Sequence, residues 1–132
     1  VSFLTAAAPN RGAILRNQPD SADRIPAALT RRARRVLEVA AAQGHRRLVL
    51  GAWGCGVFRN DPNVVAASFA EALAGAAGWF DQVVFAILDR TPGAQVYAAF
   101  AARFSSQQWD VCPSPCATTA RHTGSTSDAR QC

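Results

Sequence analysis

Residues 48–62, Leu48-Val49-Leu50-Gly51-Ala52-Trp53-Gly54-Cys55-Gly56-Val57-Phe58-Arg59-Asn60-Asp61-Pro62, decide the fold. They begin with a continuous apolar run, which is typical of strands covered on both faces. They end with Asp61-Pro62, which predicts a helix start, because Asp accepts backbone N–H bonds as an N-cap and Pro at the first helical position has no donor to lose. We therefore expect a strand over Arg47–Ala52, a Gly-rich loop and a helix.

The same alternation of strand and helix runs along the rest of the sequence. Upstream we expect a strand at Val1–Thr5, a polar connection over residues 10–25 and an amphipathic helix over Pro26–Gln43. Downstream we expect a strand at Val83–Leu88 and a third helix that carries Val96, Phe100 and Phe104 on one stripe. This β-α-β-α-β-α order predicts an α/β fold with a mainly parallel sheet. Three strands are few for such a sheet, so we also expect a missing N-terminal part.

Composition narrows the class of protein. The chain has 132 residues, 49% hydrophobic and 17% charged, which predicts one folded domain without a membrane span. All 14 basic residues are Arg, and Arg31, Arg32, Arg34 and Arg35 form a cluster. A solvated helix face and contact with a polyanion are both compatible with this cluster, but no aromatic residue interleaves with it, so we expect no direct nucleic-acid binding. Since no secretory signal is visible at residues 1–4, we expect a cytoplasmic protein.

The composition changes after Phe104 to Ser, Thr, Pro, Gln and Cys. We therefore expect a domain over residues 1–104 and a disordered tail over 105–132. The tail holds possible zinc ligands at Cys112, Cys116, His122 and Cys132, but its C-x3-C spacing departs from the common C-x2-C pairing. We expect neither a metal nor a cofactor.

The Gly-rich loop is the segment with a chemical signal. Gly54 and Gly56 follow a strand and precede a helix, a position where backbone N–H groups can approach a phosphate. Arg59 stands where G-x-G-x-x-G requires a third Gly, and there is no P-loop Lys, so a dinucleotide oxidoreductase or an NTPase is not indicated. The two glycines are equally compatible with a tight turn that binds nothing. The ring of Phe58 could pack on a sugar or a base, or it could fold back onto the helix as a hydrophobic staple.

These residues also carry a family resemblance. Gly-Cys-Gly-Val-Phe at 54–58 and Asn-Asp-Pro at 60–62, with Ala6-Ala7-Ala8-Pro9-Asn10 upstream and Val84–Leu88 downstream, resemble the C-terminal half of the bacterial-type poly(ADP-ribose) glycohydrolases, which are macrodomain proteins. The resemblance covers residues 1–104 and implies part of a three-layer α/β/α macrodomain with an ADP-ribose cleft. It implies that the backbone of Gly54, Cys55, Gly56 and Val57 contacts the diphosphate. It also implies that the ring of Phe58 stacks on the ligand. A second set of possible contacts comprises Asn10, Ala52, Trp53, Asn60 and Asp89.

The sequence departs from this family at the catalytic signature. A Gly-Gly-Gly stretch followed by Gln-Glu-Glu is absent from the 132 residues, although glycosidic cleavage needs a carboxyl group. Glu38 and Glu71 lie on expected helices as solvent-facing charges, and an Asp such as Asp89 at a strand end is usually a turn former. We therefore name no catalytic residue.

Three functions stay open at this point. The first is hydrolysis of ribose–ribose bonds in ADP-ribose polymers by a glycohydrolase-like protein to which this chain contributes the diphosphate-binding loop. The second is a non-catalytic module that binds ADP-ribose, and the third is an inactive truncated remnant. A separate chain is one conceivable source of the missing N-terminal half.

Overall fold

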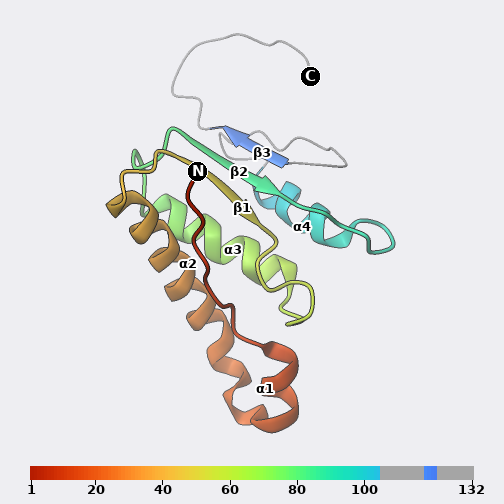
Figure 1. Cartoon of the computed structure of the whole chain (residues 1–132). Coiled ribbons are helices and arrows are strands. Elements are labelled where there is room, and N and C mark those ends of the chain that lie inside the picture. Colours follow the sequence, from red (N-terminus) through yellow and green to blue (C-terminus); the bar gives the residue numbers. More distant parts are fainter. Residues whose placement is uncertain (105–117, 122–132) are drawn as a thin grey trace.

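The computed structural model describes residues 1–104 and 118–121, which form an α/β fold (Figure 1). The expected fold class is thereby confirmed. Residues 1–10 precede the first helix, and the elements then follow in the order α1 (Arg11–Asn17), η1 (a 3-10 helix, Pro19–Arg24), α2 (Ile25–Ala42), β1 (Arg47–Gly51), α3 (Pro62–Ala74), β2 (Gln82–Ala86), α4 (Gln95–Phe104) and β3 (Thr118–Arg121).

The sheet has the strand order β1-β2-β3. Strands β1 and β2 are parallel, with Leu48 opposite Val83 and Leu50 opposite Phe85, whereas β3 runs antiparallel to β2. Because β1 and β2 are parallel, the loops that follow them leave the sheet at the same edge. This edge carries the Gly-rich loop.

The core lies between the sheet and the helices α2, α3 and α4 (Figure 1). At its centre the ring of Phe85 packs against Phe69, Phe100 and Phe104, with ring centroids 5.6, 5.3 and 4.5 Å away. Edge-to-face and offset arrangements such as these are the ones that aromatic quadrupoles favour. Phe100 and Phe104 of the stripe predicted on the third helix are part of this core, and Val96 packs against it.

Two expectations for the N-terminal quarter are wrong. Residues 1–5 form no strand, since no strand among the described residues pairs with them, and isolated strands are unstable. The polar connection expected over residues 10–25 contains α1 and η1 instead. Helix α1 begins where Asn10 Oδ1 accepts a hydrogen bond from Ala13 N at 2.9 Å, an N-cap that satisfies one of the free N–H groups of the first turn.

The helix start at Asp61-Pro62 is confirmed. Helix α3 begins at Pro62, and Asp61 Oδ1 accepts a hydrogen bond from Asn63 N at 2.8 Å. Of the disordered tail expected over residues 105–132, Thr118–Arg121 form strand β3 instead. The rest of the tail and the possible zinc ligands lie outside the described residues. None of the described helices combines the length and the apolar character that a bilayer crossing requires.

Candidate functional site

A cavity of about 460 Å³ lies between the segments that follow β1 and β2. The structure therefore brings Ala52, Cys55 and Gly56 of the Gly-rich loop together with Asp89, which lies about thirty residues further along the chain. The full lining consists of Ala52, Cys55, Gly56, Leu88, Asp89, Arg90, Thr91 and Val96. A cavity outside the carboxyl ends of parallel strands is the usual ligand position in open α/β sheets.

The two glycines of the loop differ in their surroundings. Gly54 has a φ of +75°, and a Cβ built on it would lie 2.6 Å from Ala8 Cβ and 2.6 Å from Asn60 Nδ2. Both the left-handed backbone and the close contact require Gly here. A Cβ on Gly56 would meet nothing within 4 Å, so the backbone of Gly56 is open beside the cavity.

Asn60 and Trp53 attach the loop to the N-terminal segment. The Asn60 side chain is 2% exposed, and its Nδ2 donates to Pro9 O at 2.8 Å and to Gly54 O at 3.1 Å. Trp53 Nε1 donates to Ala6 O at 2.8 Å. In the part of the chain that the structure describes, the buried Oδ1 of Asn60 has no hydrogen-bond partner. These two side chains hold the loop from behind and do not line the cavity.

Three further residues from the expected site do not line the cavity. Asn10 caps α1, and Val57 is 91% exposed. Phe58 is half-buried against the core, and its carbonyl oxygen accepts a hydrogen bond from Gly12 N at 3.1 Å. Phe58 thus connects the loop to α1, which agrees with a packing role for its ring and leaves stacking on a ligand as a prediction.

Two of the titratable groups that line the cavity have shifted pKa values. Burial, with a smaller effect from the negative charge of Asp61, raises the pKa of the Cys55 thiol to about 11. Hydrogen bonds from the Thr91 hydroxyl and from Tyr97 N lower the pKa of Asp89 to about 2. At neutral pH Cys55 is therefore a neutral thiol, which is a poor nucleophile, and Asp89 is an ionised cap of α4.

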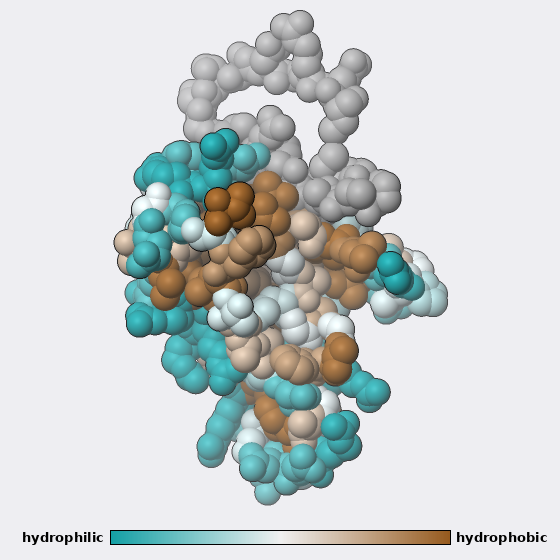
Figure 2. Space-filling view, viewed as in Figure 1, coloured by the Kyte–Doolittle hydropathy of each residue, from teal (hydrophilic) through white to brown (hydrophobic). Residues whose placement is uncertain are grey.

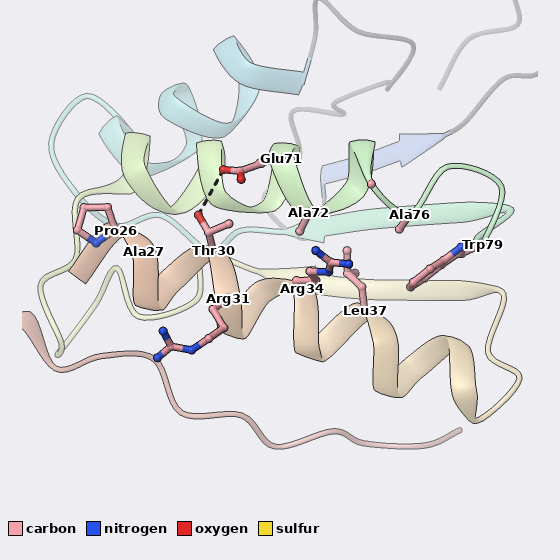
Figure 3. A pocket seen from close by; sticks show the side chains of 11 residues that line it. Pro26, Ala27, Thr30, Arg31, Arg34, Leu37, Glu71, Ala72, Ala76 and Trp79 are labelled. Carbon is pink, nitrogen blue, oxygen red and sulfur yellow. Dashed lines mark hydrogen bonds between the residues drawn. The ribbon is translucent and has the colours of Figure 1, made fainter. Parts of the chain in front are cut away.

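Glu38 and Glu71 lie outside this cavity. Glu38 pairs with Arg34 and Arg35 on α2. Glu71 accepts a hydrogen bond from Thr30 in a separate groove of about 560 Å³ between α2 and α3 (Figure 3). Asp89 is the only carboxylate that lines the loop cavity in the described ranges, and these ranges contain no cluster of three or more His, Cys, Asp or Glu residues arranged to hold a metal ion.

Sequence reasoning did not assign the residues on the far wall of the cavity. Leu88, Arg90, Thr91 and Val96 all lie in the segment after β2 or in the first turn of α4. The sequence did contain a signal for these four residues. They follow a predicted strand, and the residues that follow parallel strands lie at the same edge of the sheet.

Solved structures of known proteins resemble this chain in sequence and in fold. The parallel β1–β2 pair, the helices packed on it and the loop at its carboxyl edge match macrodomain-like α/β proteins. Crystal structures of poly(ADP-ribose) glycohydrolase from Deinococcus radiodurans in complex with ADP-ribose are among the matches, one with 49% identity and a TM-score of 0.76 over 78% of this chain and 41% of that chain. The enzyme from Thermomonospora curvata matches with 51% identity and a TM-score of 0.70 over 79% of this chain and 38% of that chain.

The chain is therefore similar in sequence and in fold to bacterial poly(ADP-ribose) glycohydrolases, and the resemblance drawn from its motifs is confirmed. It spans about two fifths of the length of these relatives. No family model and no curated protein matches the chain.

Proposed function

We propose that this chain binds the diphosphate of ADP-ribose through residues 54–58, as part of a glycohydrolase that cleaves ribose–ribose bonds in ADP-ribose polymers. The loop's unused backbone N–H groups are the observation that carries this proposal. The internal hydrogen bonds of the loop use the N–H groups of Trp53, Cys55, Arg59 and Asn60. Within residues 1–104, the N–H groups of Gly54, Gly56, Val57 and Phe58 have no protein acceptor.

The three consecutive free N–H groups of Gly56, Val57 and Phe58, in a loop before a helix, suit an anion. Successive backbone N–H groups form concave anion sites, and the positive end of α3 begins a few residues later at Pro62. Gly56 has no side chain to block the approach, and Cys55 adds only a small neutral group. The fixed frame of Gly54, Asn60 and Trp53 keeps this backbone conformation in place before the ligand arrives, so little ordering accompanies binding.

Cleavage requires a carboxyl group, and no described residue suits that task. Asp89 is ionised at neutral pH, and its oxygens already accept hydrogen bonds from Thr91 and Tyr97. Glu38 and Glu71 are outside the cavity. This observation favours a second candidate function, a module that binds ADP-ribose without turnover.

Calorimetric titration with ADP-ribose tests the binding proposal. We expect saturable binding by the wild-type chain and none by Gly56→Val, because the added side chain occupies the approach to the free N–H groups. Gly56→Ala is the matched control for bulk and should bind weakly. Since a Cβ at this position meets no protein atom, both variants should melt as the wild type does. An unchanged affinity in Gly56→Val contradicts the assignment of the loop.

Incubation with poly(ADP-ribose) separates the two candidate functions. Release of ADP-ribose by the purified chain supports a hydrolase with a complete site, whereas binding without release supports the module. Phe58→Ala should weaken ADP-ribose binding by about 1–3 kcal/mol if the ring stacks on the ligand. An unaltered affinity, together with a lower melting temperature, would assign Phe58 to packing alone.

A further inference from the structure

The groove between α2 and α3 shares no lining residue with the loop cavity and has a chemistry of its own. Its volume is about 560 Å³, which is within the range of small-molecule sites. Buried small and apolar side chains, among them Leu37, Ala72 and Ala76, form its floor (Figure 3). Arg31 and Arg34 of α2 line the same groove. The groove therefore combines an apolar floor with positive charge.

Trp79 lies at one end of this groove. It follows α3, where Trp79 N donates to Ala76 O at 3.0 Å, and Figure 3 shows its ring beyond the end of the helix. The residue is 39% exposed, although its large ring is a major source of burial energy. An exposed indole ring offers a face on which a purine base can stack. The sequence shows no aromatic residue among the arginines of α2, but the fold places Trp79 in the groove that two of them line.

Helix α2 supplies the positive charge. Arg31 and Arg34 are neighbours on one face of the helix, and Figure 2 shows hydrophilic side chains gathered over α2. Among the described residues, Arg31 has no carboxylate partner. Arg34 pairs with Glu38, but its side chain is 73% exposed. Because an exposed ion pair is weak, a more strongly charged anion such as a phosphate can replace Glu38. Glu71 also lines the groove, where it faces the two guanidinium groups.

We propose that the α2–α3 groove is a second binding site for poly(ADP-ribose), apart from the loop. An ADP-ribose unit within the polymer stacks its adenine on Trp79 and places its diphosphate on Arg34 and Arg31. Each unit of the polymer carries an adenine and a diphosphate, so a ring beside two guanidinium groups matches its repeat, whereas an acidic peptide matches the arginines alone. Arg suits this task because its planar guanidinium binds phosphate oxygens through two parallel bonds. The identity of the ligand rests on the proposed function, in which the polymer is the substrate.

A site at the groove lets one polymer chain contact the protein twice. The loop precedes α3, and the groove lies along the second half of the same helix. The rise from Pro62 to Ala72 is about 15 Å along the helix axis. Once one unit occupies the loop, the following units are held near the groove at a high effective concentration. A long polymer should therefore bind more tightly than ADP-ribose, which fills one site at a time.

Equilibrium binding of size-fractionated poly(ADP-ribose) and of ADP-ribose tests the proposal. In the double variant Arg31→Gln/Arg34→Gln, the affinity for long polymer should fall by about tenfold or more, because the second contact is lost. The affinity for ADP-ribose should stay unchanged. The control is Arg47→Gln/Arg103→Gln, which removes the same charge at exposed positions outside the groove and should weaken polymer binding far less. All four side chains are exposed, so both variants should melt as the wild type does.

Trp79 provides a separate readout of the stacked base. Trp79→Ala should weaken polymer binding by about tenfold, whereas Trp79→Phe keeps a ring and should retain most of the affinity. In an NMR titration, the indole N–H of Trp79 should shift as polymer is added. The charge contribution is measured by the salt dependence: in Arg31→Gln/Arg34→Gln, the slope of log affinity against log salt concentration should become shallower by about 1 to 2.

Gly56→Val separates the groove from the loop. This variant should lose ADP-ribose binding but keep the part of polymer binding that Arg31→Gln/Arg34→Gln removes. If the loop assignment fails, Gly56→Val changes neither affinity, and the groove variants still decide this inference.

Two results would overturn the proposal. The first is an affinity for long polymer that is equal in Arg31→Gln/Arg34→Gln and in its control. The second is competition by poly-glutamate or single-stranded DNA that displaces the polymer as effectively as unlabelled polymer does, which would make the groove a general surface for polyanions.

Discussion

Replacing Gly54 by Ala should destabilise the chain severely, although it adds a single methyl group. The φ of +75° places the residue in the left-handed region, which costs a residue with a Cβ about 1–2 kcal/mol. The new Cβ would also lie 2.6 Å from both Ala8 Cβ and Asn60 Nδ2, a separation far below van der Waals contact.

Neither neighbour of Gly54 can move aside easily. Ala8 Cβ is fixed to the backbone at a buried position, and Asn60 Nδ2 is held by its bonds to Pro9 O and Gly54 O. Overpacking at a site of this kind costs about 1–3 kcal/mol. The two effects together predict a loss of about 2–5 kcal/mol in the free energy of unfolding.

Urea unfolding followed by circular dichroism measures this loss, with Gly56→Ala as the matched control. A Cβ on Gly56 meets no atom within 4 Å, so its substitution should change the free energy of unfolding by less than about 1 kcal/mol. Equal losses in the two variants, or a Gly54→Ala chain as stable as the wild type, would refute the packing of the loop on Ala8 and Asn60.

Three further predictions concern residues around the loop. Asn60→Ala should lower the free energy of unfolding by about 1–3 kcal/mol, because it leaves the buried Pro9 carbonyl group without its donor, Asn60 Nδ2; a urea midpoint equal to that of the wild type would argue against this account. At pH 8, Cys55 should react with iodoacetamide about 100-fold more slowly than in the urea-unfolded chain, since its pKa rises from 9.0 to about 11, and site-resolved mass spectrometry showing equal rates would contradict the buried thiol. The lowered pKa of Asp89 adds stability that is present above its ordinary pKa of 3.8 and is lost as the pH falls through about 2. Asp89→Ala should therefore melt at a lower temperature at pH 7 and lose less stability than the wild type between pH 4 and 2, and parallel acid profiles would count against the cap.

Elements that rest on local chemistry were predictable from the sequence. The start of α3 depends on Asp61 and Pro62, which are adjacent, and the stripe of α4 depends on the spacing of Val96, Phe100 and Phe104. The segment 1–5 has the composition of a strand, but a strand also needs a neighbour, and composition does not provide one. Helix α1 was missed because its seven residues are too few to show a helical period, although its cap, Asn10, is visible in the sequence.

The candidate site was predictable in position but not in internal organisation. Strand order alone places Asp89 beside the Gly-rich loop. The separate roles of Gly54 and Gly56, which look equivalent in the sequence, depend on Ala8 and Asn60. Likewise, Asn60 supports the loop through Pro9, which is 51 residues away along the chain. Contacts over such separations follow from the complete fold and not from any local pattern.

An NMR titration of the ¹⁵N-labelled chain with ADP-ribose, with AMP as the control ligand, tests the central claim most directly. The account predicts saturable shifts of the Gly56 and Val57 amides with ADP-ribose, accompanied by shifts in residues 88–91 across the cavity. AMP lacks the diphosphate and should shift these amides far less. Amides of the loop that stay unshifted at saturating ADP-ribose, or shifts confined to the α2–α3 groove, would contradict the assignment of residues 54–58 as the diphosphate-binding loop.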